Sequence, residues 1–384
     1  MAENKNIPEI RFDGFIDAWE QRKLGELCTE FKSGDFISAQ EIEVSGPYPV
    51  YGGNGLRGYT DRYNHDGEYA LIGRQGALCG NMNFSFGKAY FTEHAVAVKA
   101  DKFNDTRFLF YCFGNMNLGQ YSGQSAQPGL AVGNLVELKT LVPSKPEQEK
   151  ISATLTHLDA LITLHQRKYE RLKNVKKSML EKMFPHDGAN IPEIRFDGFT
   201  EAWEQRQFSE LYERVSEKND LTYGKDKIIS VANMYFKPDS YITDPEYLRT
   251  YNVFHLGDIA FEGNKSKNFA HGRFVENTIG NGIVSHVFDV FRPITEYDLL
   301  FWKYAINNER IMGSVLVRCT KASTMMTNLV ANDFLQESIL VPTVEEQQKI
   351  GAFLDQLDNL ITLHQRKYEK LKQIKKSMLE KMFV

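Results

Sequence analysis

Two stretches of the chain carry apolar residues at alternating spacings of four and three, the pattern of a helix that packs along one face. The first stripe comprises Ile151, Leu155, Leu158, Ile162, His165, Tyr169, Leu172, Met179 and Met183. The second comprises Ile350, Leu354, Leu357, Ile361, His364, Tyr368, Leu371, Met378 and Met382. Lys176 and Lys375 interrupt the two stripes at the same point. Heptads sustained this long predict two helices that pack on each other as a coiled coil.

Start and stop signals frame both predicted helices. Ser144 with Glu147 and Thr343 with Glu346 each fit a capping box, in which a hydroxyl and a carboxylate satisfy the first free backbone N–H groups. Pro185 ends the first helix. From Glu147 to Phe184 that helix would measure ~57 Å at a rise of ~1.5 Å per residue. We therefore expect a rod whose second helix returns antiparallel to the first.

The chain repeats itself. Residues 6–22 and 190–206 agree at 15 of 17 positions, and residues 141–184 and 340–383 agree at 32 of 44. The intervening inserts, roughly 23–140 and 207–339, show no similarity that can be aligned by eye. A duplicated framework with two divergent inserts predicts a pseudo-twofold molecule, in which each insert recognises something different.

Both inserts mix short strands with helices, and the fold class is therefore α+β. Alternating or apolar runs between glycine-rich turns predict the strands. The predicted strands are Tyr69–Ile72, His94–Val98, Asp258–Phe261 and Ile283–Phe291, and the predicted helices are Arg107–Asn115 and Tyr297–Asn308. We expect four segments: residues 1–142 with the first insert, the helix 143–184, residues 185–341 with the second insert, and the helix 342–384.

Composition and charge narrow the class. The four cysteines form no C-x-x-C pair, no signal peptide or apolar span is evident, and a cytoplasmic location is expected. The net charge of −4 is unlike that of a typical nucleic-acid binder. The two predicted helices are nevertheless basic, at +5 for residues 150–184 and +4 for residues 349–383. Their exposed faces suit a polyanion or the acidic surface of a partner, or are simply solvated.

The repeated strings LITLHQRKYE and KKSMLEKMF, each after an E-Q-x-K-I helix start, resemble the conserved regions of Type I restriction-modification specificity subunits. The insert strings GQSAQPGLAVGNL and DIAFEGNKSKNFAHGRFVEN resemble two types of target-recognition domain. The resemblance implies a non-catalytic subunit that assembles with two adenine-N6 methyltransferase subunits and two motor-nuclease subunits. S-adenosylmethionine, ATP and Mg²⁺ would belong to those partners, with no cofactor or metal on this chain. Each insert would read one half of a bipartite DNA site, while the helices set the gap and dock the methyltransferase subunits.

Side chains that read base edges are sought in the polar loops of the inserts, because Arg or Lys suits guanine and Asn or Gln suits adenine. The candidates are Arg57, Arg62, Arg74, Gln75, Gln124 and Gln127 in the first insert, and Lys265, Lys267, Asn268, Arg273, Lys321 and Ser323 in the second. The stripe residues Leu155 to Leu172 and Leu354 to Leu371 are the predicted helix–helix interface, and His165 and His364 are interpreted as packed side chains rather than metal ligands.

Two other classes of function remain open from the residues. Asp258 to Lys265 approaches a nuclease's metal-binding set, but two residues separate Glu262 from Lys265 where one is expected. A scaffold that joins two modules without binding DNA is compatible with acidic inserts. No phosphate-binding loop of the G-x-x-x-x-G-K-[ST] type occurs, and the sequence therefore gives no sign of ATP-driven translocation.

Overall fold

The computed structural model describes residues 6–76, 78–122, 129–186, 188–238, 242–322 and 326–384. The chain forms two compact units. The first contains residues 1–166 and 365–384, and the second contains residues 167–364. Each unit is described by itself.

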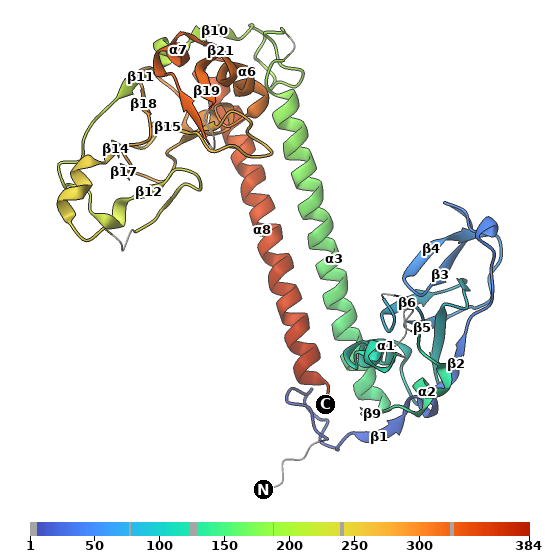
Figure 1. Cartoon of the computed structure of the whole chain (residues 1–384). Coiled ribbons are helices and arrows are strands. Elements are labelled where there is room, and N and C mark those ends of the chain that lie inside the picture. Colours follow the sequence, from blue (N-terminus) through green and yellow to red (C-terminus); the bar gives the residue numbers. More distant parts are fainter. Residues whose placement is uncertain (1–5, 77, 123–128, 187, 239–241, 323–325) are drawn as a thin grey trace. The chain divides into compact units, whose positions relative to one another are not determined.

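Two long helices confirm the heptad prediction. Helix α3 covers Lys145–Lys182 and helix α8 covers Val344–Met382. Both helices run through the boundary between the units, and each unit therefore contains one part of each helix. Within each unit the two parts lie side by side and run in opposite directions (Figure 1). The expected antiparallel pairing is thus present in both units.

The first unit is built mainly on antiparallel strand pairs. Strand β1 (Glu20–Lys23) pairs with β9 (Lys139–Val142). A four-stranded sheet has the order β2 (Cys28–Ser33), β8 (Ala95–Ala100), β5 (Glu68–Gly73), β6 (Met82–Phe86). A second sheet has the order β4 (Gly55–Thr60), β3 (Tyr48–Gly52), β7 (Tyr90–Phe91). Helices α1 (Thr106–Asn115) and α2 (Val132–Glu137) complete the regular elements, with short 3₁₀ turns at Leu24–Leu27, Ala39–Glu41 and Leu118–Tyr121.

The second unit repeats this plan. Strand β10 (Glu204–Gln207) pairs with β21 (Ser338–Val341). Its four-stranded sheet has the order β11 (Tyr212–Val215), β18 (Val290–Pro293), β15 (Ile259–Glu262), β16 (Arg273–Glu276). The two-stranded pairs are β12 (Ile229–Ser230) with β13 (Tyr235–Phe236), β14 (Asn252–Phe254) with β17 (Gly282–Val284), and β19 (Thr320–Ala322) with β20 (Thr327–Leu329). The helices are α4 (Phe208–Leu211), α5 (Leu299–Ala305), α6 (Glu309–Cys319) and α7 (Ala331–Gln336), with 3₁₀ turns at Lys225–Lys227 and Pro245–Thr250.

The two inserts therefore share an architecture that their sequences do not reveal by eye. The four-stranded sheets match strand for strand, and helix α1 corresponds to α5. Both of these helices begin after an aspartate whose carboxylate accepts a hydrogen bond from the backbone N–H three residues later, Asp105 in the first unit and Asp298 in the second. The short pattern Asp-x-x-Phe-x-x-Tyr, residues 105–111 and 298–304, is a sequence signal of this correspondence.

One predicted strand was wrong. Residues 283–291 form two strands, β17 and β18, which belong to different sheets. The Phe288 N–H donates to the Ser285 carbonyl between them and closes a turn there. Hydrophobicity alone could not show this break, because apolar residues stand on both sides of it. The predicted helix Tyr297–Asn308 is also shorter, and a further helix, α6, follows after Asn308, whose side chain caps its first turn.

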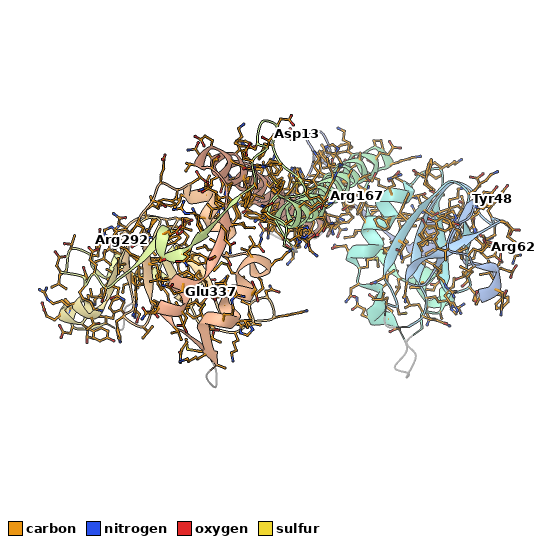
Figure 2. All side chains as sticks on the ribbon, turned by 90° about the horizontal axis from the view of Figure 1, so that it is seen from above. Asp13, Tyr48, Arg62, Arg167, Arg292 and Glu337 are labelled. Carbon is orange, nitrogen blue, oxygen red and sulfur yellow. The ribbon has the colours of Figure 1, made fainter. Side chains whose placement is uncertain are left out.

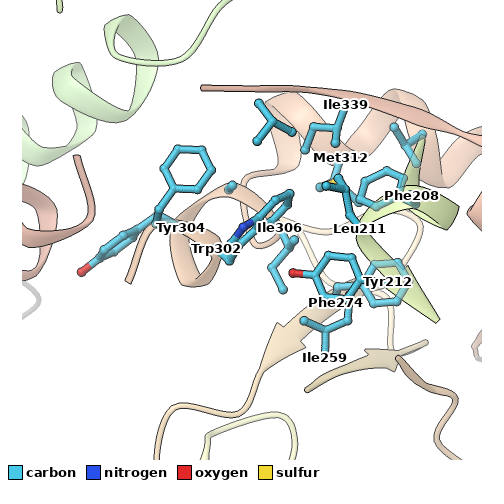
Figure 3. Packing of buried hydrophobic residues seen from close by; sticks show 14 of the residues in the cluster. Phe208, Leu211, Tyr212, Ile259, Phe274, Trp302, Tyr304, Ile306, Met312 and Ile339 are labelled. Carbon is cyan, nitrogen blue, oxygen red and sulfur yellow. The ribbon is translucent and has the colours of Figure 1, made fainter. Parts of the chain in front are cut away.

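Each unit has an aromatic core with the same three contributors. In the first unit Trp19, from the repeated segment, contacts Phe108 of α1 and Phe383 near the end of α8, with ring centroids 6.1 and 6.2 Å away. In the second unit Trp203, Phe301 and Phe184 form the corresponding group, with centroids 5.6 to 6.0 Å apart. The repeated framework thus packs around α1 in the first unit and around α5 in the second. Around Trp302 the second core extends through the side chains Phe208, Tyr212, Ile259, Phe274 and Met312 (Figure 3).

Helix α5 approaches α8 more closely than a side chain would permit. A Cβ placed on Gly351 would lie 2.5 Å from Asp298 Oδ1 and 2.6 Å from the Phe301 backbone nitrogen. Ser152 occupies the corresponding position of the first repeat and is buried there. The N-terminus of α5 therefore depends on glycine at this point of α8.

Candidate nucleic-acid interface

A small cavity of about 380 Å³ in the first unit brings predicted residues together. The turn between β3 and β4 contributes Asn54, and β4 itself contributes Arg57. The end of β5 leads into Gln75, and His94 completes the lining. Arg57 and Gln75 were predicted, and both side chains are exposed. Asn54 and His94 were missed, although the GGNG run that contains Asn54 marked a turn. The cavity offers a guanidinium beside amides, the groups that read guanine and adenine edges.

Backbone contact between glycines builds this cavity. A Cβ on Gly73 would lie 2.2 Å from the Gly53 carbonyl oxygen, so the β3–β4 turn rests directly on the end of β5. The Arg74 N–H then donates to the His94 carbonyl at 2.9 Å. Close packing of three segments fixes the polar side chains on a rigid base rather than on a long loop.

Other candidates of the first insert are bonded within the unit. Arg62 donates to Glu41 at 2.6 Å and lies over the Tyr90 ring, and Figure 2 shows it near Tyr48. Arg74 donates to the Leu130 carbonyl at 3.3 Å and to the Ser33 hydroxyl at 3.2 Å. These contacts indicate that Arg62 and Arg74 hold neighbouring segments of the first unit together. Gln124 and Gln127 lie outside the described residues.

In the second insert the loop after β15 lies against the β19–β20 hairpin. The Thr327 N–H donates to the Gly263 carbonyl at 2.8 Å, and Asn264 pairs with Met326 in an isolated bridge. The loop carries Lys265, Lys267 and Asn268, and the hairpin carries Lys321; all four are exposed residues. The loop and the strand pair that carry these candidates are therefore adjacent. Ser323 lies outside the described residues.

Arg273 is engaged inside the second unit. Its Nε donates to Glu262 Oε2 at 2.8 Å, and its Nη2 donates to the Ala232 carbonyl at 2.6 Å. Its guanidinium also lies 4.9 Å from the centroid of the Phe269 ring. These contacts hold the base of the loop.

The two carboxylates of the nuclease-like segment are also occupied by arginines. Asp258 accepts two hydrogen bonds of 3.1 Å from Arg292 and one of 2.9 Å from the His255 N–H. Burial raises the pKa of Asp258 above its usual value, against the opposing effect of Arg292. Glu262 is the acceptor for Arg273. The segment is therefore strand β15 and the loop after it. Its two carboxylates form ion pairs within the unit and are not an open set of metal ligands.

The predicted capping boxes were wrong in one respect. The carboxylates of Glu147 and Glu346 do not reach back to the helix start; each accepts two hydrogen bonds from an arginine of the repeated segment. Arg11 Nε and Nη2 lie 2.7 and 2.8 Å from the Glu147 oxygens, and Arg195 makes the same contacts to Glu346. A bidentate charged pair is stronger than a single bond to a backbone amide. The hydrogen bond to the glutamate also raises the pKa of each arginine.

We name these two contacts the Arg–Glu latches. Each latch ties the segment before an insert to the helix after it, and the geometry is the same in both repeats. Glu147 and Glu346 are 1% and 0% exposed, so the latches are buried. The duplicated framework is therefore closed around each insert by a contact that does not depend on the insert's own sequence.

The predicted interface residues lie along the inner stripes of the long helices. Leu155 and Leu158 share a core with Met378 of α8, and Leu172 of α3 shares one with Leu354 and Leu357. The remaining stripe residues, Ile162, His165, Tyr169, Ile361, His364, Tyr368 and Leu371, are half-buried. Outside the stripe, Arg167, Lys168 and Arg171 of α3 are exposed, as are their counterparts in α8. Among the described residues, no helix combines the length and apolar character needed to cross a membrane.

Two unlike polar surfaces on one duplicated framework are the organisation of a protein that recognises two different targets. Comparison with known proteins agrees. The family described as "Type I restriction modification DNA specificity domain" matches residues 16–174 and 201–373. The Type I restriction enzyme EcoprrI specificity subunit of Escherichia coli is 48% identical over 146 residues, which cover 37% of this chain and 36% of that protein.

Two further matches cover nearly the whole chain. The Type I restriction enzyme MjaVIII specificity subunit of Methanocaldococcus jannaschii is 20% identical over 98% of this chain and 94% of its own length. The crystal structure of a Type I restriction-modification S subunit from M. genitalium has a TM-score of 0.65 at 16% identity, covering 98% of this chain and 99% of that one, and therefore shares the fold. The chain belongs to the Type I restriction-modification DNA specificity family, as a non-catalytic subunit with two target-recognition domains. The resemblance, the fold class and the functional class inferred from the sequence are thereby confirmed.

Proposed function

We propose that the chain selects a bipartite DNA sequence for adenine-N6 methylation, with one recognition domain reading each half. One observation carries this proposal: the framework is repeated in detail, down to the Arg–Glu latches, while the exposed polar surfaces differ. A repeated framework holds both domains in equivalent ways. Unlike surfaces then select unlike half-sites, and two long helices set the number of unspecified bases between them.

In the first domain, the cavity residues Asn54, Arg57 and Gln75 are the proposed base readers. An amide bonds two atoms of an adenine edge in the major groove, and a guanidinium bonds two atoms of a guanine edge. Arg62 and Arg74 support the surface through their internal bonds. Of the earlier candidates in this domain, Gln124 and Gln127 remain predictions.

In the second domain, the loop residues Lys265, Lys267 and Asn268 and the hairpin residue Lys321 are the proposed contacts. The lysines suit phosphates or guanine, and the amide of Asn268 suits adenine. Ser323 remains a prediction, and Arg273 supports the loop. The two domains thus present different chemistry: amides around one arginine in the first, and a lysine-rich surface in the second.

The partners we propose are two methyltransferase subunits and, for cleavage, two motor-nuclease subunits. S-adenosylmethionine, ATP and Mg²⁺ would be bound by those subunits, in the cytoplasm. The proposed docking surface is the exposed basic face of the helices, which includes Arg167, Lys168 and Arg171. The domain boundaries at 142, 184 and 341 belong to the same proposal.

The charge distribution supports a division of labour. The chain carries −4 overall although its long helices are basic, and the recognition domains are therefore acidic as a whole. Affinity for DNA depends largely on the number of phosphates that Lys and Arg neutralise. We expect the isolated chain to bind DNA weakly and the methyltransferase subunits to supply much of the phosphate contact. Tight sequence-specific binding by the chain alone would contradict this.

The deciding experiment is a genome-wide map of N6-methyladenine in a host that expresses this chain with its cognate methyltransferase subunit. A host with the methyltransferase subunit alone is the control. We expect methylation only when both are present, at a two-part motif with a fixed gap. If both proteins assemble and no new motif appears, the proposal is wrong, and a scaffold without DNA specificity becomes the better account.

A further inference from the structure

Lys176 and Lys375, which interrupt the apolar stripes, each have a partner on the opposite helix. Lys176 Nζ of α3 lies 2.5 Å from Asp358 Oδ1 of α8, inside the second unit. Lys375 Nζ of α8 lies 2.6 Å from Asp159 Oδ1 of α3, inside the first unit. The lysine side chains are 23% and 24% exposed, so both pairs are largely covered. The break in the heptads is therefore an interhelical ion pair made twice, with the roles of the helices exchanged.

A tyrosine from each insert completes the arrangement. The Tyr304 hydroxyl of α5 donates to Asp358 Oδ2 at 2.7 Å, and the Tyr111 hydroxyl of α1 donates to Asp159 Oδ2 at 2.8 Å. Each lysine also lies over the ring of that tyrosine, 5.0 Å from its centroid for Lys176 and 5.3 Å for Lys375. We call each set of three residues a Lys–Asp–Tyr clamp. It joins α3, α8 and one recognition-domain helix, α1 in the first unit and α5 in the second.

The clamps distinguish one pairing register of the helices from its neighbours. An apolar heptad stripe can slide by seven residues and still meet another stripe, whereas a polar pair at one position is lost by such a slide. On both helices the lysine follows the aspartate by 17 residues, as 159 to 176 and 358 to 375 show. Both clamps therefore form together in one antiparallel register, and a slide by one heptad breaks both.

Stability alone does not account for these charges. Covered ion pairs lose hydration, and well-packed apolar residues in the same place are often at least as stabilising. The tyrosines support the same conclusion, because they belong to inserts of different sequence and yet contact equivalent aspartates. A polar contact made in two unlike domains, where apolar residues could stabilise the helix pair equally well, favours a role in specifying the register.

We propose that the two Lys–Asp–Tyr clamps are positioning residues: they fix the register of α3 on α8 and hold helix α1 of the first recognition domain and helix α5 of the second to that register. The clamps thereby set the gap between the half-sites without contacting DNA. The link to the gap rests on the proposed function, whereas the fixing of register does not.

The test uses the full chain with both lysines replaced, Lys176→Met and Lys375→Met, together with its cognate methyltransferase subunit. The methylated motif should keep its two half-sites but appear with additional gap lengths, at least tenfold more often than with the unchanged chain. Tyr304→Phe should give a smaller increase. Exchange of one pair, Lys176→Asp with Asp358→Lys, should largely restore a single gap. The control, Lys177→Met with Lys376→Met, removes exposed lysines one position away and should change nothing.

A second measurement reports register without DNA. A photo-cross-linking amino acid in place of Lys173 should react with α8 near Ile361, because both residues line the same cavity of the second unit. Loss of both clamps should add products seven residues away, near Leu354 and Tyr368. If the variant without clamp lysines folds and shows one gap and one cross-link site, the clamp proposal is overturned. If the unchanged chain gives no two-part motif but the cross-links spread as expected, the proposed function fails and the register role stands.

Discussion

Removing one arginine of a latch should open one unit and leave the other intact. In Arg11→Met the Glu147 carboxylate, 1% exposed, loses both of its charged hydrogen bonds. Breaking a buried pair from one side costs about 3–5 kcal/mol. Glu147 lies in the first turn of α3, where the helix dipole offsets about 0.3–1 kcal/mol of that cost. We therefore expect a loss near the lower end, about 3 kcal/mol, confined to the first unit.

Hydrogen exchange measured peptide by peptide suits this question, because a chain with two units need not unfold in one transition. A loss of about 3 kcal/mol corresponds to roughly a hundredfold faster exchange in peptides that cover residues 6–23 and the start of α3. Peptides of the second unit should exchange as before. Arg195→Met should give the reverse pattern, since its latch has the same geometry.

Two controls separate the latch from a general effect of lost charge. Arg22 pairs with Glu26 on the surface, with side chains 43% and 50% exposed, and Arg22→Met should leave hydrogen exchange nearly unchanged, because water screens this pair. The double variant Arg11→Met with Glu147→Leu removes the stranded carboxylate and should recover much of the loss. An effect of Arg11→Met below about 1 kcal/mol would refute the account of the latch given above.

Three further predictions concern the recognition domains and their support. Arg57→Ala should lower base discrimination at the first half-site by about 1–3 kcal/mol and leave the second half-site unchanged. Methylation maps measure this, with Arg62→Ala as the control. An altered second half-site would contradict the assignment. Gly351→Ala should destabilise the second unit by about 1–3 kcal/mol in urea unfolding, because the added Cβ would meet α5. The matched variant Ser152→Ala in the first repeat should cost less. Equal effects would argue against the close approach of α5 to α8. Burial holds the pKa of Glu276 well above its usual value, so the folded state keeps a proton that the unfolded chain releases, and stability falls as pH rises above about 4.3. Glu276→Gln should therefore raise the melting temperature more at pH 8 than at pH 5, and a gain that does not depend on pH would rule out this explanation.

The long helices and the internal repeat could be predicted because both are written in local or periodic patterns. An average apolar spacing of 3.5 residues identifies a helix without knowledge of its tertiary partners, and Pro185 marks the end of the first helix. The α+β class of the inserts followed from short apolar runs between glycines. What failed was the interpretation of residues 283–291 as one strand, since a turn inside an apolar run leaves no mark in hydrophobicity.

The candidate DNA-reading residues could likewise be predicted only in part. The residue types and loops that suit DNA bases were visible in the sequence. The structure brings Arg57 and Gln75 to one cavity and places the lysine-bearing loop against the strand pair that includes Lys321. Which arginines are already bonded was not visible, because Arg62 and Arg74 meet partners far along the chain. Asn54 was not predicted, because the glycines beside it indicate a turn and give no sign that its amide lines a cavity.

Periodic and repeated patterns along the chain are enough to place the long helices, to show that the framework is duplicated and to show that the two inserts differ. The roles of the interrupting lysines and of the helix-start glutamates follow only from contacts made in the folded chain. Their partners lie 136 to 216 positions away in the chain, and no local pattern specifies such a pairing. The capping-box motif predicted a local bond for Glu147, but a buried bidentate contact to Arg11 is stronger than that bond, and the global fold prevailed over the local signal.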